Sequence, residues 1–114
     1  MAKERQHLYE GMYILSTALT DDARQKLIDK MVASIEEKGG ELHKIFDQGR
    51  KRLMYEIAKK REGHYFLFYF SLPTEVMGKL WREYRLNEDV LRFMTKRAPF
   101  PTVPEKIEFQ PLPE

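Results

Sequence analysis

The sequence contains no cysteine, no hydrophobic run of membrane-spanning length and no apolar leader segment. Without cysteine the chain can form neither a disulfide nor a thiolate metal site, which suits a reducing compartment. The first seven residues, MAKERQH, are mostly polar or charged, unlike the apolar core of a signal peptide. These absences lead us to expect a cytoplasmic protein that has no membrane contact.

Motifs of common enzyme families are also missing. The sequence has no phosphate-binding loop, nucleophile elbow, zinc-peptidase motif or dinucleotide fingerprint. Its histidines, His7, His43 and His64, fall in separate segments without metal-ligand spacing. Glu10 lies inside an apolar segment, where pairing with an arginine across a sheet is a commoner role than acid catalysis. We therefore expect no enzymatic activity, metal, cofactor or small-molecule substrate.

The charges that are present divide unevenly along the chain. Charged residues make up 33% of the 114 residues, and the formal net charge is +2. Residues 1–97 contain 19 Lys and Arg against 15 Asp and Glu, whereas residues 98–114 contain one Lys against three Glu. A basic body with an acidic tail favours a polyanion together with a separate basic partner.

Hydrophobic periodicity predicts six regular elements. A helix over about 20–38 is indicated by Thr20 as its N-cap, by Asp21 and Asp22 in its first turn, and by Gly39 after its end. A second helix follows Pro73 and ends near Leu86. The predicted strands are 8–15, 41–60, 64–72 and 90–96, the last with Leu91 and Phe93 on one side and Arg92, Met94 and Lys96 on the other.

The β-α-β-β-α-β order predicts an α+β, ferredoxin-like split βαβ fold, a four-stranded antiparallel sheet with both helices on one face. Strand 41–60 is polar at intervals, so we expect an edge strand with a bulge near Gly49, and residues 61–63 should form the following hairpin turn. We expect an N-terminal arm over 1–7, a domain over 8–97 and a proline-rich extended tail over 98–114.

Aromatic residues are concentrated in strand 64–72, which is apolar on both faces and should be central. Phe66, Phe68 and Phe70 share one face, and Tyr65, Leu67 and Tyr69 share the other. The second set should lie on the side of the sheet without helices, which we call the helix-free face. An exposed aromatic strand is typical of RNA-recognition domains, where rings stack on bases. The match is partial, and packing in the sheet or against a protein is the simpler interpretation.

Basic residues form three groups that could bind phosphates by displacing counterions. Two are short runs, residues 50–52 and 59–61. The third is spread over the second helix and last strand, and it consists of Lys79, Arg82, Arg85, Arg92, Lys96 and Arg97. Solvated helix and strand faces would give a similar pattern, so composition alone leaves the choice open.

The segment GRKRLMYEIA at residues 49–58 resembles the signature of the bacterial ribosomal protein S6 family. Met54 departs from that pattern, because the family prefers serine or alanine there. Other family marks stand in order around it, namely Tyr9-Glu10, Gly39-Gly40, Gly63-His64-Tyr65 and residues 86–92. The resemblance covers roughly residues 8–97.

The resemblance implies a non-catalytic protein that pairs with ribosomal protein S18 and binds the central domain of small-subunit ribosomal RNA. RNA-facing candidates are then Tyr9, Arg82, Arg85, Arg92 and Arg97. Arg50, Lys51 and Arg52 could face either the RNA or the partner. Candidates for the protein partner are the helix-free face and the tail, that is, Tyr65, Leu67, Tyr69, Phe100, Ile107 and Phe109.

Two other functions fit the predicted fold. One is a stand-alone module that binds single-stranded RNA through the helix-free face. The other is a small ferredoxin-like enzyme such as an acylphosphatase, but Ser16-Thr17-Ala18 offers neither the glycines nor the arginine of a phosphate cradle. We expect the ribosomal function.

Overall fold

A computed structural model describes residues 6–57, 59–99 and 102–107 of the chain. Its strands are β1 (Gln6–Ser16), β2 (Glu41–Ile57), β3 (Lys60–Pro73) and β4 (Val90–Arg97). Its helices are α1 (Asp21–Glu37) and α2 (Met77–Leu86), and a short 3₁₀ turn, η1 (Thr74–Val76), precedes α2. The predicted β-α-β-β-α-β order is confirmed.

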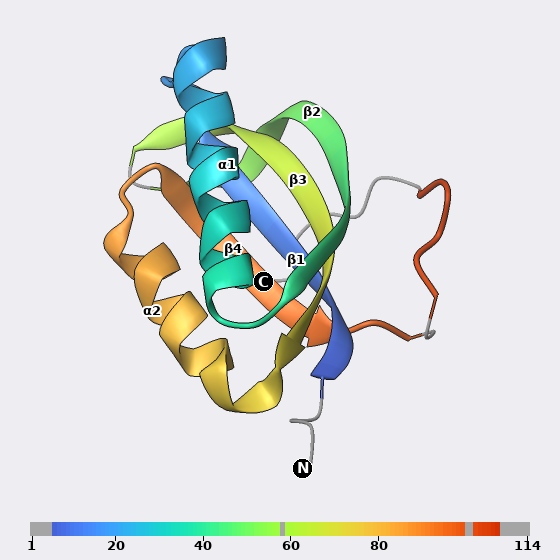
Figure 1. Cartoon of the computed structure of the whole chain (residues 1–114). Helices are drawn as coiled ribbons and strands as arrows, with labels where there is room; N and C mark the ends of the chain where they lie inside the picture. The colour runs from blue at the N-terminus through green and yellow to red at the C-terminus, as the bar shows by residue number, and fades with distance from the viewer. Residues whose placement is uncertain (1–5, 58, 100–101, 108–114) are drawn as a thin grey trace, which may run out of the picture.

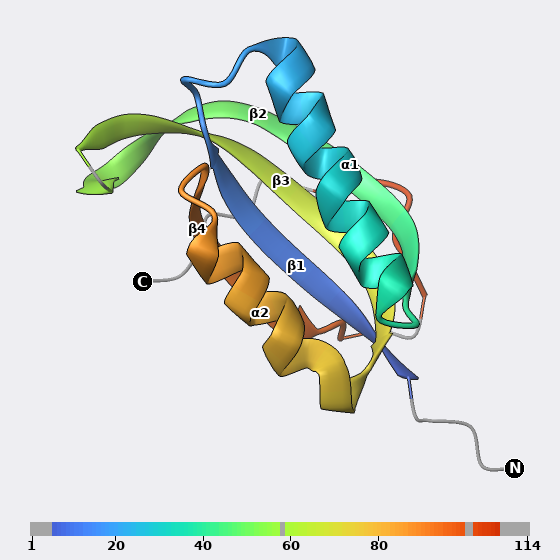
Figure 2. The same ribbon diagram turned by 60° about the vertical axis from the view of Figure 1, so that its left-hand side comes forward.

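The strands form one antiparallel sheet in the order β2-β3-β1-β4 (Figure 1). β1 lies between β3 and β4, so that Tyr13 is opposite Phe66 on one side and Phe93 on the other. β2 and β4 are the edge strands. Both helices lie against the same face of the sheet (Figure 2). The ferredoxin-like fold is therefore confirmed.

Local signals explain where α1 begins and ends. The Thr20 side chain accepts a hydrogen bond from the Ala23 amide at 3.1 Å, and Asp21 and Asp22 stand in the positive first turn. After the helix, Gly39 adopts φ +86°, a left-handed conformation that glycine tolerates. Leu27, Ile28, Met31 and Ile35 form the buried stripe.

The β2–β3 hairpin is longer than predicted. The bulge near Gly49 is confirmed, because the register shifts between Asp47 and Gly49, and Gly49 has φ +82°. The predicted turn at residues 61–63 is wrong, since the ladder continues to Ile57 opposite Lys60. Gly63 lies inside β3, where an added Cβ would stand 2.2 Å from the Ile14 side chain. Close packing, rather than a turn, explains this glycine.

The helix face of the sheet carries the main core. Tyr13, Phe68 and Phe70 are buried there beneath α1 and α2. Tyr13 and Tyr84 join sheet and helix through a hydrogen bond of 3.1 Å and an edge-to-face ring contact. Burial raises the pKa of Tyr13 well above its ordinary value, and the electrostatic interaction and hydrogen bond with Tyr84 raise it further.

The helix-free face is covered by the C-terminal tail. Met12, Leu67 and Tyr69 form a second buried cluster, and Ala98, Val103 and Ile107 of the tail pack against it. The Lys44 ammonium also donates to the Glu105 carbonyl oxygen at 3.0 Å, which ties the tail to β2. Figure 2 shows this segment behind the sheet, opposite the helices.

The faces of β4 differ in one respect from the prediction. The register shifts between Ile14 and Leu15, which pair with Arg92 and Val90. Phe93 packs in the helix-face core, but Leu91 packs with Ile14 on the helix-free face. The prediction that Leu91 and Phe93 share a side is therefore wrong, because the bulge breaks the strict alternation of the strand.

Candidate nucleic-acid interface

Two arginines of α2 point to solvent because the opposite side of the helix is anchored to the sheet. Met77, Leu80 and Tyr84 are buried, and the Trp81 indole donates to the Thr95 hydroxyl of β4 at 3.1 Å. These contacts fix the rotation of the helix about its axis. Arg82 and Arg85 are consequently exposed along its outer side.

Arg92 belongs to the neighbouring strand, β4, at the edge of the sheet. It is exposed and stands opposite Ile14. Tyr84 of α2 contacts Phe93 with ring centroids 5.3 Å apart, so helix and strand lie side by side. Its pairing with Ile14 directs Arg92 to the helix-free side of β4, whereas Arg82 and Arg85 lie on the helix side. We call these three arginines, which lie on the two sides of one sheet edge, the basic edge.

No acid neutralises the basic edge within the described segments. The ion pairs of the described residues involve other cations. Among these residues, no carboxylate lies within ion-pair distance of Arg82, Arg85 or Arg92. Lys79 of α2 is likewise exposed. Unpaired guanidinium groups at a surface are suited to phosphate oxygens, which accept their hydrogen bonds in fixed geometry.

Lys96 and Arg97, at the end of β4, have partners within the chain. Arg97 donates to Nδ1 of His7 at 2.7 Å. The Lys96 ammonium lies 3.6 Å from Oε2 of Glu10, which is the residue opposite it in the ladder. A cross-strand partner of Glu10 was predicted, and the structure supplies a lysine rather than an arginine.

Glu10 also accepts a hydrogen bond of 2.9 Å from the Tyr69 hydroxyl. Burial, together with this bond to the carboxylate, raises the pKa of Tyr69 to about 12. Glu10, Tyr69 and Lys96 thus form a connected polar group, in which Glu10 and Tyr69 are buried and Lys96 is exposed. This satisfied group explains Glu10 without catalysis.

Tyr9 lies on the helix face rather than on an exposed arm. It is buried, its ring centroid is 5.8 Å from that of Phe70, and its hydroxyl lies 3.2 Å from that of Thr74. Its neighbour His7 belongs to β1, which begins at Gln6. The position of Tyr9 therefore gives it no surface with which to contact RNA.

The run at residues 50–52 does not present a single surface. Arg50, Lys51 and Arg52 are all exposed, but strand alternation directs Lys51 to the face opposite its neighbours. Arg50 donates to the Thr17 carbonyl oxygen at 2.9 Å. Arg52 faces a hollow near the hairpin tip. The structure thus divides the three among different surroundings.

The aromatic strand is packed within the chain, which agrees with the simpler interpretation, and it is not exposed as an RNA-stacking or partner surface would need to be. Tyr65, Leu67 and Tyr69 are 7%, 0% and 3% exposed. The tail covers the last two, and Tyr65 packs with Ile14 and Leu53. Of the tail residues predicted to contact a partner, Ile107 packs on the sheet of its own chain, while Phe100 and Phe109 lie outside the described residues.

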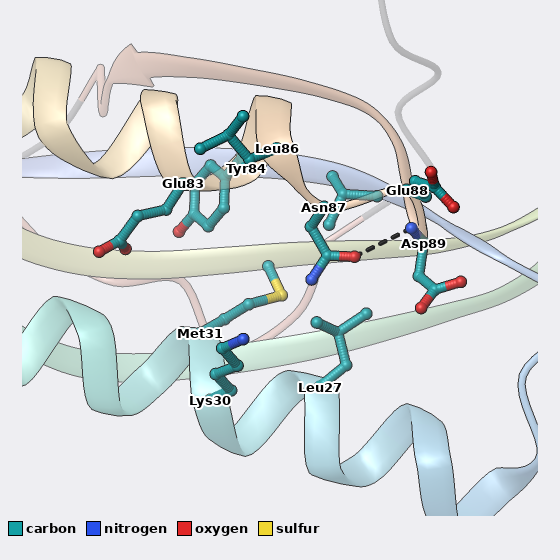
Figure 3. Close-up of a pocket in the computed structure, with 10 residues that line it drawn as sticks. Leu27, Lys30, Met31, Glu83, Tyr84, Leu86, Asn87, Glu88 and Asp89 are labelled. Atoms are coloured by element: carbon teal, nitrogen blue, oxygen red, sulfur yellow. Dashed lines mark hydrogen bonds between the residues drawn. The ribbon is translucent and has the colours of Figure 1, made fainter.

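A groove of about 410 Å³ runs between α1 and the α2–β4 loop (Figure 3). Its buried lining includes Leu27, Met31 and Tyr84, and Glu83, Glu88 and Asp89 contribute carboxylates. Desolvation raises the pKa of Glu83, but hydrogen bonds from Lys38 and Ser34 outweigh that effect and lower the pKa below its ordinary value. Three acids against Lys30 make this groove unsuited to a polyanion, and none of the predicted site residues lines it.

In the described part of the chain, no three His, Asp or Glu side chains lie close enough together to hold a metal ion. His64 is buried within β3, as the predicted strand 64–72 implies, and it stacks on Phe66 with ring centroids 4.6 Å apart. Its Nε2 lies 2.6 Å from Oδ1 of Asp47.

None of the described helices is long and apolar enough to cross a membrane.

Comparison with known proteins places the chain among ribosomal proteins. The family described as Ribosomal protein S6 matches residues 8–97. The chain belongs to the ribosomal protein S6 family. It is a structural constituent of the small ribosomal subunit and not an enzyme.

Individual relatives of the chain agree with the family assignment. Small ribosomal subunit protein bS6 of Chlamydia pneumoniae is 51% identical over 114 residues, which cover the whole of both chains. The protein of that name from Protochlamydia amoebophila is 50% identical over all of this chain and 98% of its own. The crystal structure of 30S ribosomal protein S6 from Thermotoga maritima superposes with a TM-score of 0.77 and 28% identity, covering 82% of this chain and 89% of that one.

Proposed function

We propose that the chain binds the central domain of small-subunit ribosomal RNA through the basic edge, together with ribosomal protein S18. The observation that carries this proposal is the exposure of Arg82, Arg85 and Arg92 on two packed elements, with no acidic partner among the residues that the structure describes. Membership of a ribosomal protein family indicates ribosomal RNA as the ligand, and the arginines can bind its phosphates. RNA phosphates are the commonest anions that such a surface meets in a ribosome.

The energetic basis is counterion release. Each arginine that neutralises a phosphate releases a condensed cation, which makes the affinity fall steeply with salt. The anchoring of α2 by Trp81 means that the side chains start from a fixed backbone, so less entropy is lost on binding. The sheet edge and the helix then hold the three arginines on one packed framework.

For the protein partner, we propose a composite surface made of the tail and the sheet rather than the bare aromatic strand. Val103 and Ile107 face inward, whereas Thr102, Glu105 and Lys106 are exposed. The sequence from residue 98 onward has a net charge of −2, which suits a basic protein such as S18. The docked tail would thus present its polar side to the partner.

The stand-alone single-stranded RNA module is not favoured. That function needs rings on which bases can stack. Tyr65 and Tyr69 are buried, and the Tyr69 hydroxyl is already bound to Glu10. We expect no appreciable binding of the isolated protein to short single-stranded RNA.

The test is a salt titration of binding to a transcript of the central domain in the presence of S18. In the variant Arg82→Gln/Arg85→Gln/Arg92→Gln, the log–log salt slope should fall by about two, at roughly 0.7–0.9 for each phosphate that is no longer neutralised. A matched control, Arg24→Gln/Lys26→Gln/Lys30→Gln, removes as many charges from α1 and should bind like the wild type. An unchanged slope in the first variant would refute the role of the basic edge.

A further inference from the structure

The tip of the β2–β3 hairpin holds a second concentration of positive charge. A hollow of about 440 Å³ lies there, which we call the hairpin hollow. Its lining residues are Thr17, Arg52, Lys59, Lys60, Arg61 and Glu62. Cations thus outnumber the single carboxylate four to one. The basic run at residues 59–61 is evident in the sequence. Because the turn was predicted at 61–63, the sequence did not indicate that this run lies near Arg52 on the facing strand.

The strand pairing brings these charges together. Arg52 stands opposite Glu62, and Ile57 stands opposite Lys60, so residues 53–56 of β2 bulge past Arg61. Lys59 adopts φ +65°, a left-handed conformation that non-glycine residues rarely hold. The tight reversal of the chain between the paired residues Ile57 and Lys60 requires such a positive φ, and it holds Lys59 at the tip of the hairpin.

The cations of the hairpin hollow are not neutralised by the rest of the described chain. Arg52, Lys59, Lys60 and Arg61 are all exposed. Among the residues that the structure describes, no carboxylate forms an ion pair with any of the four. Like charges held close together repel one another, and an anion that enters the hollow would relieve that repulsion.

We propose that the hairpin hollow binds phosphate groups of the ribosomal RNA, as a second contact separate from the basic edge. This inference rests on the proposed function and extends it to another part of the sheet. Nucleic acid is favoured over protein, because the hollow offers several cationic donors side by side. Backbone phosphates, spaced regularly along a strand, can accept hydrogen bonds from several such donors at once.

The test uses the full chain with S18 and the same central-domain transcript. In Lys59→Gln/Lys60→Gln/Arg61→Gln the salt slope should fall by about two, and affinity should fall on the order of 10–100-fold. The variant Lys59→Arg/Lys60→Arg/Arg61→Lys keeps the charges and should bind like the wild type. The α1 variant Arg24→Gln/Lys26→Gln/Lys30→Gln controls for the loss of net charge. Thermal melting of the two hairpin variants should match the wild type, because the side chains that they change are exposed.

The outcomes separate this inference from the proposed function. If the hairpin variant keeps the wild-type slope while the basic-edge variant loses its own, the hairpin inference is wrong and the proposed function stands. If the hairpin variant loses affinity for S18 alone and retains the RNA slope, the hollow is a protein contact and the inference is again wrong. If both variants keep the wild-type slope, the proposed function itself fails.

Discussion

Leu67 and Phe68 are neighbours in β3 and both are 0% exposed, yet they are covered by different parts of the chain. Phe68 lies in the core beneath the helices, whereas Leu67 lies in the cluster covered by the tail. The helices are held by caps, periodic stripes and hydrogen bonds. The described tail residues, 98–99 and 102–107, form no helix or strand and contribute only a few apolar side chains. The two faces of the sheet should therefore differ in how strongly their covers are held.

This difference also locates the surfaces that remain for binding. Helices occupy one face of the sheet and the tail occupies part of the other, which buries most of the aromatic residues. Exposed cations remain at the basic edge and at the hairpin hollow. Binding is thus expected at the margins of the sheet, while the ring-rich strand in its centre serves stability.

The largest effect is expected on the helix face. Phe68→Ala should lower the free energy of unfolding by about 3–5 kcal/mol, because it removes a buried ring and leaves a cavity that helices cannot fill. Urea unfolding monitored by circular dichroism measures this loss. A loss below about 1 kcal/mol would mean that the face is not packed as described.

A smaller effect, and one that depends on the tail, is expected one residue earlier. Leu67→Ala should lower the free energy of unfolding by about 2–4 kcal/mol in the full chain. In a Val103→Asp background the loss should shrink by at least about 0.5 kcal/mol, since a partly released tail admits water to the cavity. Phe68→Ala should show no such coupling. Additive losses for Leu67 and Val103 would show that the tail is not the cover of Leu67.

Release of the tail alone should have a modest effect. Val103→Asp should lower stability by about 1 kcal/mol, because it replaces a half-buried apolar side chain with a charge on the helix-free face. Thr102→Asp is the matched control, since Thr102 is exposed and should tolerate the same charge. Thermal melting compares the two, and equal melting temperatures would argue that the tail is not docked.

The smallest effect is a shift in the ionisation of Tyr69. Its pKa lies near 12 rather than the usual 10.0 because of burial and the bond to Glu10, so stability should decline as the pH rises from 10.0 toward 12. In that interval the unfolded chain loses a proton that the folded chain keeps. Val103→Asn, which adds no charge, should lower this pKa by exposing the ring. The absorbance of tyrosinate measures the pKa of Tyr69, and the variant Tyr69→Phe assigns the signal. An unshifted pKa would mean that the tail does not cover Tyr69.

Helix α1 and the aromatic β3 could be predicted because their signals are local. Thr20, Gly39 and the alternation of Phe66, Phe68 and Phe70 each reflect the conformation of a few consecutive residues. The basic residues of α2 were also correctly placed on its exposed side. Pattern and capping residues are sufficient for such elements.

The remaining features depend on contacts between distant residues. Gly63 fits a hairpin turn equally well in sequence, and only the approach of Ile14 explains it. The exposure of Leu91 and Tyr69 depends on a bulge and on a tail that folds back over the sheet from the far end of the chain. Nothing in the tail sequence specifies which surface Val103 and Ile107 contact. The segment that buries the helix-free face was therefore beyond sequence patterns.

The central claim is that RNA is bound by exposed arginines and not by the aromatic strand. Arginine-specific chemical modification, read by mass spectrometry in the free protein and in its complex with S18 and the central-domain transcript, tests it directly. Arg82, Arg85 and Arg92 should become protected in the complex, whereas Arg24, which is paired with Asp21 on α1, should react equally in both states. If the three arginines of the basic edge remain as reactive in the complex as in the free protein, the claim is contradicted.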